Sequence, residues 1–294
     1  MVNNQLPDIQ GESPNISIGI KQVGVENVEV PFKLEAKHGG FYQLIANVSM
    51  RTNIDDKTKG ISMSRLIRTL KPYLDLPLKH TLVKLILEDI KKNIGGTASF
   101  IKFEFKFPMI KKSIKSNNSF PLFYKCKFEG QLYDSIIYDD DRKDEKVSTF
   151  KFYQGAIIQY ASYCPCSSEL CKHLETQNEI GFPHNQRSFA NILIESKEPD
   201  YIWLENIIET VESKLNTLPY PIVKREDEQE IARIASKNPM FVEDAIRLIS
   251  MSLESLPISD WIVKCIHEES IHTSEAIAVN WKGVSGGFKG QRFI

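Results

Sequence analysis

The stretch FIKFEFKFP, residues 100–108, decides the fold class of this chain. Apolar and charged residues alternate from Ile101 to Phe107, and successive side chains of a strand point to opposite faces. The apolar set is Ile101, Phe103, Phe105 and Phe107, and the charged set is Lys102, Glu104 and Lys106. One apolar face and one charged face are typical of a half-buried strand in an antiparallel sheet.

More strands are expected on both sides of this one. Stretches rich in β-branched, aromatic and other apolar residues predict them. These stretches are residues 42–54, 150–163, 187–196 and 260–281.

Helices are expected between the strands. Apolar residues at helical spacing predict a helix over residues 77–93, which Gly95 and Gly96 should stop. Further helices should begin near residue 64 and near residue 200.

A last helix is expected around the stretch NPMFVEDAIRLISMSL. Asn238 is its predicted N-cap, and Pro239 is its predicted first residue. Its buried stripe should be Phe241, Ala245, Leu248 and Ile249.

The order strands, helices, strands therefore occurs twice. This order indicates two tandem units, each an antiparallel sheet with a helix pair on one face, which is an α+β arrangement. We expect the units to cover residues 1–163 and 164–294, with most of the functional site in the second unit.

Composition narrows the function classes. The chain has 294 residues, 26% of them charged, and a formal net charge of −1. A nucleic-acid-binding protein would show an excess of basic residues, so we expect no nucleic-acid partner. The first residues, MVNNQLPDIQGESP, show no basic start followed by an apolar run. We expect a cytoplasmic protein that does not span a membrane.

A cluster of cysteines follows the strand predicted at 150–163. The stretch YCPCSSELCKHL, residues 163–174, holds Cys164, Cys166, Cys171 and His173, and FPHNQRS adds His184. Thiolates and imidazoles are the ligands that zinc and similar ions prefer. Such a cluster in an intracellular chain more often binds metal or reacts than forms disulfides.

The spacing within the cluster leaves three interpretations open. A closed structural site needs four protein ligands, which the cluster can supply, but zinc knuckles usually separate paired cysteines by two to four residues. Here a single residue separates Cys164 from Cys166. A catalytic site with an open position is the second interpretation, and buried cysteines that only fill space are the third.

Carboxylates that could serve such a site occur later in the chain. They lie in KREDEQE (224–230), in NPMFVED (238–244) and in HEESIHTSE (267–275). Charged runs of this kind usually form solvated surfaces. Glu243 differs because it lies near an expected helix start, where a carboxylate is electrostatically favoured.

Motifs spread along the chain resemble those of the prokaryotic type IB GTP cyclohydrolases. They occur in the order of that family and cover most of the chain. The motifs are LPDIQ (6–10), VGVENVEVP (23–31), KGISMSRL (59–66), CPCS (164–167), HNQRS (184–188), YPIVKREDE (220–228), NPMFVED (238–244) and ESIHTSEAIA (269–278).

The resemblance implies a fold, a reaction and an assembly. The fold would be the tunnelling fold, with two units per chain in a homotetramer whose active sites lie at subunit interfaces. The reaction would be hydrolysis of GTP to formate and 7,8-dihydroneopterin triphosphate, the first step towards folate and, in many bacteria, towards queuosine and other 7-deazaguanines. A divalent metal, zinc, manganese or iron, would be the cofactor.

The resemblance also implies a metal site and a base-recognition residue. Cys164, His184 and Glu228 match the metal ligands of the family. Glu243 matches the glutamate that holds the guanine edge. A carboxylate suits that task because it accepts two parallel N–H bonds.

Further residues match positions around the reacting atoms. His272 would transfer protons, Cys166 would line the site, and Glu269 would lie near it. The candidate triphosphate contacts are Arg187, Arg65 and Lys224.

Two alternatives remain from the sequence. One is a different tunnelling-fold enzyme acting on a purine or pterin. The other is a non-catalytic scaffold with a closed metal site that uses Cys166, Cys171 or His173. Cys171 and His173 lie in an insertion that the family pattern does not require.

Overall fold

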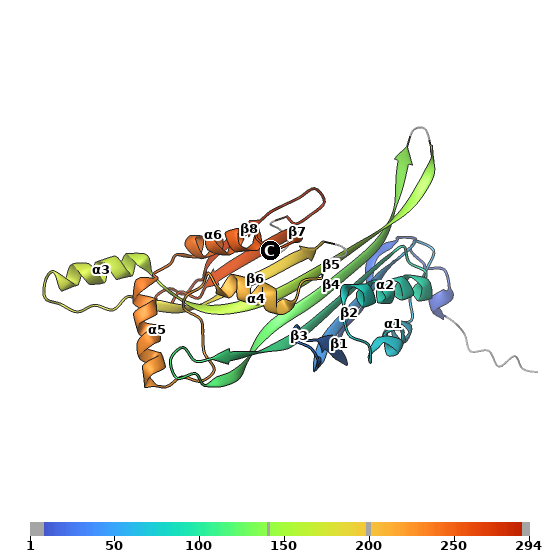
Figure 1. Ribbon diagram of the computed structural model, residues 1–294. Coiled ribbons are helices and arrows are strands. Elements are labelled where there is room, and N and C mark those ends of the chain that lie inside the picture. Colours follow the sequence, from blue (N-terminus) through green and yellow to red (C-terminus); the bar gives the residue numbers. More distant parts are fainter. Residues whose placement is uncertain (1–8, 140–141, 198–200, 290–294) are drawn as a thin grey trace, which may run out of the picture. The chain divides into compact units, whose positions relative to one another are not determined.

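The structure, a computed structural model, describes residues 9–139, 142–197 and 201–289 (Figure 1). Its strands are β1 (Ile20–Glu35), β2 (Phe41–Ile54), β3 (Ala98–Lys112), β4 (Ser119–Asp139), β5 (Arg142–Tyr163), β6 (Asn185–Ser196), β7 (Ile258–His267) and β8 (Ala276–Trp281). Its α-helices are α1 (Met63–Leu70), α2 (His80–Ile94), α3 (Pro165–Glu175), α4 (Leu204–Glu212), α5 (Arg225–Lys237) and α6 (Val242–Leu253). Two short 3-10 helices are η1 (Ile9–Gly11) and η2 (Lys71–Tyr73).

The strands follow one another in sequence order, β1 to β8, in a single sheet. The β1–β2, β2–β3, β6–β7 and β7–β8 pairs are antiparallel. The α+β class predicted from the sequence is confirmed, as are strands at the predicted positions. In β3 the four apolar residues of the opening stretch are all at most 6% exposed.

The chain divides into two compact units. The described residues of Met1–Phe105 and Lys127–Tyr153 form one unit, and those of Lys106–Cys126 and Gln154–Ile294 form the other. Strands β3, β4 and β5 therefore contribute residues to both units. The tandem boundary expected between residues 163 and 164 stays a prediction.

The core of the first unit lies between α2 and its strands. Leu82, Val83, Ile86, Leu87 and Ile90 of α2 are buried. The helix ends at Gly95, whose φ of 89° is the left-handed conformation that glycine adopts most easily. This end confirms the predicted stop signal.

Aromatic rings fill the same core across several strands. The Phe105 ring lies 5.0 Å from that of Phe32 and 5.3 Å from that of Phe128, measured between centroids. The Phe152 ring lies 5.4 Å from that of Phe128. Tilted and edge-on rings at these distances add to the stabilisation from apolar burial.

The second unit places α4 and α6 over buried strand residues. Helix α4 buries Ile207, Ile208 and Val211. Helix α6 buries Ala245 and Ile249, two residues of the predicted stripe. The apolar residues of both helices are thereby removed from water.

The start predicted for α6 is wrong. The helix begins at Val242, and Asn238 is the C-cap of α5. The Asn238 side chain donates to the Ile234 carbonyl at 2.6 Å, so it serves the preceding helix. Phe241 is the N-cap of α6, which leaves its ring 41% exposed and outside the buried stripe.

Candidate active site

The two halves of the predicted metal motif meet at the end of β5. Cys164 follows β5 directly and is the N-cap of α3. Its backbone N–H donates to the His184 carbonyl at 3.3 Å, and the His184 N–H donates to Ser167 Oγ at 3.3 Å. The structure thus brings Cys164 and His184 together, although 19 residues separate them in the chain.

The start of α6 is tied to the same place. The Met240 N–H donates to the carbonyl of Tyr163, the residue before Cys164, at 2.9 Å. Glu243 follows in the first turn of α6 and is exposed. A carboxylate there is stabilised by the helix dipole and remains available to a ligand.

A polar network leads from His184 to Glu269. His184 Nδ1 lies 3.3 Å from Gln186 Oε1, and Gln186 Nε2 donates to Glu269 Oε1 at 3.0 Å. The second oxygen of Glu269 lies 3.9 Å from His184 Nδ1. With Nδ1 donating to Gln186, the imidazole leaves Nε2 as its metal-binding atom, which is the usual arrangement around a metal-bound histidine.

A second polar cluster, on the neighbouring strands β5, β6 and β7, is buried. His267 is 1% exposed. Its Nε2 lies 2.9 Å from Tyr160 Oη, and its Nδ1 lies 3.1 Å from Ser162 Oγ. Ser162 Oγ lies 2.8 Å from Ser188 Oγ. Burial lowers the pKa of His267 to about 4, against the opposing effect of the Glu243 charge, so the ring is neutral at pH 7.

Helix α5 carries Glu228 on an exposed surface. The neighbouring Asp227 is fully buried and accepts backbone N–H bonds from Lys115, Ser116 and Lys224 at 2.8, 2.9 and 2.8 Å. Burial by itself raises the pKa of Asp227, but the bonds from Ser116 and these N–H groups outweigh it and lower the pKa well below its usual range. Asp227 therefore fixes the helix start on which Glu228 stands.

The remaining predicted residues lie at the surface. His272, Cys166, Arg187 and Lys224 are exposed. Arg65 lies on α1 in the other compact unit, where its guanidinium donates to the Asn93 carbonyl at 3.4 Å.

Among the described residues, no group of three or more His, Cys, Asp and Glu side chains is placed to hold a metal ion. The structure therefore brings together Cys164 and His184 but does not bring Glu228 to them within one chain. The donor atoms present at the junction, a thiol and a free imidazole nitrogen, fit a zinc-like ion.

The geometry of α3 argues against the closed structural site. On a helix, Cys166 and Cys171 point roughly 140° apart, and Cys166 and His173 stand roughly 10 Å apart along the axis. Cys171 lies against Gly181, because a Cβ added to Gly181 would be only 3.0 Å from the Sγ of Cys171. The His173 ring instead lies beside Gln177, with nitrogen atoms 3.2 Å apart.

Gln186, His267 and Asp227 were missed as site residues in the sequence. A usable pattern existed for Gln186 and Ser188, because both fall on the face of β6 that holds the buried Ala190. Polar residues at buried strand positions need partners, and their partners are the site residues.

The family of the chain follows from comparison with known proteins. The sequence model described as "Type I GTP cyclohydrolase folE2" matches residues 6–278. The chain belongs to the type I GTP cyclohydrolase FolE2 family. It is 31% identical over 284 residues to the GTP cyclohydrolase FolE2 of Cereibacter sphaeroides (strain ATCC 17029 / ATH 2.4.9), covering 95% of this chain and 76% of the relative. The FolE2 of Paracoccus denitrificans (strain Pd 1222) is 30% identical, with 95% and 84% covered.

Solved structures of similar fold are urate oxidases. The chain matches a uricase from "Bacillus fastidious" with a TM-score of 0.53 at 8% identity, covering 88% of this chain and 92% of that one. It matches the urate oxidase of Bacillus subtilis 168 with a TM-score of 0.51 at 10% identity, covering 88% and 97%. These likenesses concern the fold alone, and they confirm the predicted tunnelling fold. No helix in the described part of this FolE2 chain is long and apolar enough to cross a membrane.

Proposed function

We propose that this protein is a prokaryotic type IB GTP cyclohydrolase, which hydrolyses GTP to formate and 7,8-dihydroneopterin triphosphate. One observation carries the proposal: in a FolE2-family chain, Cys164 meets His184 next to the Gln186–Glu269 network. A cysteine bonded through its backbone to a histidine whose ring is oriented by Gln186 beside Glu269 is suited to metal-assisted hydrolysis.

A divalent ion, zinc, manganese or iron, would be held by Cys164 and His184, with Glu228 as the third ligand that the family resemblance implies at a subunit interface. The ion supplies positive charge that polarises a water molecule and brings its pKa towards neutrality. The fit rests on Cys164 and His184, whose backbones are hydrogen-bonded and whose side chains are only partly buried. Glu228 stands exposed on a helix whose start Asp227 fixes.

The chain's own residues would recognise the base and move protons. Glu243, exposed in the first turn of α6, would accept the ring N–H and amino groups of guanine. His272 would transfer protons as the five-membered ring of the base opens, because histidine is the side chain that most often serves as a general acid or base. Glu269 would hold the orientation of His184 through Gln186. Cys166 would line the opening.

Exposed basic residues would bind the triphosphate. They are Arg187, Lys224 and Arg65. Guanidinium groups match phosphate oxygens with two parallel bonds, whereas an ammonium group acts as a point charge.

The setting of the reaction is part of the proposal. The enzyme would act as a homotetramer with no nucleic-acid or membrane partner, in the cytoplasm. Its product would enter folate synthesis or the synthesis of queuosine and other 7-deazaguanines.

The test is an anaerobic assay of metal-reconstituted protein with GTP. Formate is measured directly, and the pterin is measured by fluorescence after oxidation. His184→Ala should abolish both products, whereas His173→Ala should retain them, because His173 is exposed on α3 and contacts Gln177.

Three outcomes would count against the proposal. Formate without a pterin would mean that the reaction stops after ring opening. Equal turnover in His184→Ala would remove the metal site from the reaction. No turnover with zinc, manganese or iron in well-folded protein would point to another substrate.

A further inference from the structure

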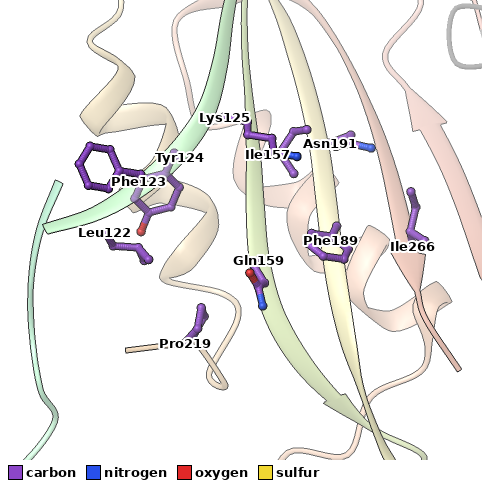
Figure 2. A pocket seen from close by; sticks show the side chains of 10 residues that line it. All are labelled: Leu122, Phe123, Tyr124, Lys125, Ile157, Gln159, Phe189, Asn191, Pro219 and Ile266. Carbon is purple, nitrogen blue, oxygen red and sulfur yellow. The ribbon is translucent and has the colours of Figure 1, made fainter. Parts of the chain in front are cut away.

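A cavity of about 310 Å³ lies in the second compact unit. Neither Cys164 nor His184 is among the residues that line it. It is formed on β4, β5, β6 and β7 (Figure 2). In β6 its lining residues Phe189 and Asn191 alternate with the buried Ala190 and Ile192, so they point to the opposite face of the sheet. None of the residues assigned above to metal, base or triphosphate lines it.

Three polar side chains in the lining have unused hydrogen-bonding capacity. Asn191 Oδ1 is buried and has no hydrogen-bond partner in the structure. Among the described residues, neither the Lys125 ammonium nor the Gln159 amide makes a hydrogen bond or ion pair. Tyr124 differs, because its hydroxyl donates to Glu212. A buried acceptor without a partner is costly, and a bound donor would remove that cost.

The charge around the cavity is positive. Lys125 lines it, and Lys264 lies directly opposite Asn191 in the β6–β7 register, on the same face of the sheet. No acidic residue is among the lining residues. An anionic group would therefore be favoured near Lys125.

The remaining walls are apolar and partly aromatic. Phe189 and Ile266 are paired across β6 and β7, and in the view of Figure 2 Phe189 lies between Gln159 and Ile266. Phe123 lines the cavity and is 57% exposed. Ligand sites commonly combine such walls with a few polar groups, in volumes from about 300 Å³ upward.

We propose that this cavity binds a planar heteroaromatic anion that carries ring N–H donors. The flat ring contacts Phe189 and Ile266, the N–H groups donate to Asn191 Oδ1 and Gln159, and the anionic group pairs with Lys125. This is a second site, separate from the one proposed for GTP hydrolysis. It goes beyond the proposed function, because its residues take no part in turnover.

The probe is pterin-6-carboxylate, which is planar, anionic, rich in N–H groups and fluorescent. Binding is measured by fluorescence anisotropy in Glu243→Ala protein, where the proposed guanine site lacks its anchor. We expect saturable binding of one molecule per chain. The planar anion 1-naphthoate, which has no N–H donor, should bind about tenfold or more weakly by comparison.

Cavity variants locate the site in the same Glu243→Ala background. Lys125→Met and Asn191→Leu should each weaken binding about tenfold or more. Lys106→Met is the matched control, because Lys106 is exposed on β3 outside the lining. Lys125 is also exposed, so Lys125→Met should fold normally. This variant therefore still tests the site if Asn191→Leu is unstable.

The outcomes separate this site from the proposed reaction. Loss of binding in Lys125→Met with full binding in Lys106→Met supports the cavity. Absence of binding in Glu243→Ala protein, or equal binding in all variants, overturns it. GTP turnover of the single variants Lys125→Met and Asn191→Leu should remain unchanged. If pterin binding to the cavity fails, the GTP assay therefore still tests the proposed function on its own.

Discussion

Gln186 connects a predicted metal ligand to a predicted site carboxylate. It is 7% exposed and contacts both His184 and Glu269 through its amide. An amide is suited to this position because it accepts from one partner and donates to the other. The orientation of the His184 ring therefore depends on a residue that does not touch the metal itself.

Replacing Gln186 with Leu should weaken metal binding. The leucine fills similar space but leaves His184 Nδ1 and Glu269 without their partner. Loss of such a supporting bond typically lowers metal affinity by about 10–100-fold. The measurement is a zinc titration against a competing chelator. Asn185→Ala is the control, because the Asn185 side chain is exposed and donates to the Tyr163 hydroxyl rather than to His184 or Glu269. Equal affinity in Gln186→Leu and wild type would remove Gln186 from the site.

His267 should make the fold sensitive to acid. Its pKa is about 4 in the folded chain against an ordinary value of 6.5, because burial penalises the charged ring. The unfolded chain therefore binds more protons between these two values, and stability rises with pH where the unfolded state binds more protons. Lowering the pH from 6.5 towards 4 should reduce the free energy of unfolding, by at most about 1.4 kcal/mol per pH unit from this residue. Below pH 4 this loss levels off.

The test is urea unfolding of wild type, His267→Gln and His38→Gln at several pH values. Wild type and His38→Gln should lose stability alike on acidification, because His38 is exposed. His267→Gln should start lower, since it disturbs the Tyr160 and Ser162 contacts, but should lose less on acidification. The same slope in all three proteins would contradict the account.

At the scale of single residues, the sequence predicted which residues form the candidate site better than it predicted which of them contact one another. The Cys164–His184 pair was implied by the family resemblance, and the structure joins the two residues by a backbone hydrogen bond. The Gln186 and His267 contacts depend on strands that pair far apart in sequence, such as Ser188 with His267. No local pattern encodes that register.

Among the elements, β2, β3 and β5 to β8 lie in stretches predicted as strands, whereas β1, β4 and the helices α3 and α5 were not predicted. The alternation of apolar and charged residues in β3 directly indicates that one face of this strand is buried. Helix α3 buries no residue, so it shows no apolar stripe to detect. Helix α5 buries only Asp227 and Ala235, and its charged start resembled a solvated surface. Cys164, a predicted metal ligand, is the N-cap of α3, and Glu228, another, lies in the first turn of α5.

Gly130 on β4 allows α2 to lie close to the sheet. A Cβ at this position would come within 2.3 Å of Val83 Cγ1 and 2.9 Å of Leu87 Cδ1. Gly130→Ala should therefore overpack the first unit and lower the free energy of unfolding by about 1–3 kcal/mol. Urea unfolding measures it. Gly60→Ala is the control, since no atom lies within 4 Å of its added Cβ. A loss no larger than in the control would show that the helix is not packed this tightly.

At the scale of the whole molecule, the strand order begins with β1 and ends with β8. Among the described residues, each of these two strands has one neighbouring strand in the sheet. Exposed apolar side chains occur near both, with Ile18 at 70% and Ile20 at 45% near β1 and Ile277 at 56% on β8. Open edges and exposed apolar residues favour association between chains.

The homotetramer is proposed from the family resemblance alone, and the edges of β1 and β8 are the surfaces through which we expect chains to meet. Four chains of 33.7 kDa have a mass of about 135 kDa, which light scattering after size exclusion measures. Ile18→Lys combined with Ile277→Lys should lower the mass, because charge on an edge opposes pairing. A wild-type mass of one chain at micromolar concentration would contradict the tetramer.

The central claim, a metal held at the Cys164–His184 junction, is tested most directly by cobalt substitution. Co²⁺ bound by a thiolate shows an intense charge-transfer absorption that oxygen and nitrogen ligands do not give. Anaerobic titration of wild type should give this band, saturating at one ion per chain. Cys171→Ala should keep the band, and Cys164→Ala should lose it. A band that persists in Cys164→Ala and disappears in Cys171→Ala would place the metal on α3 and contradict the account.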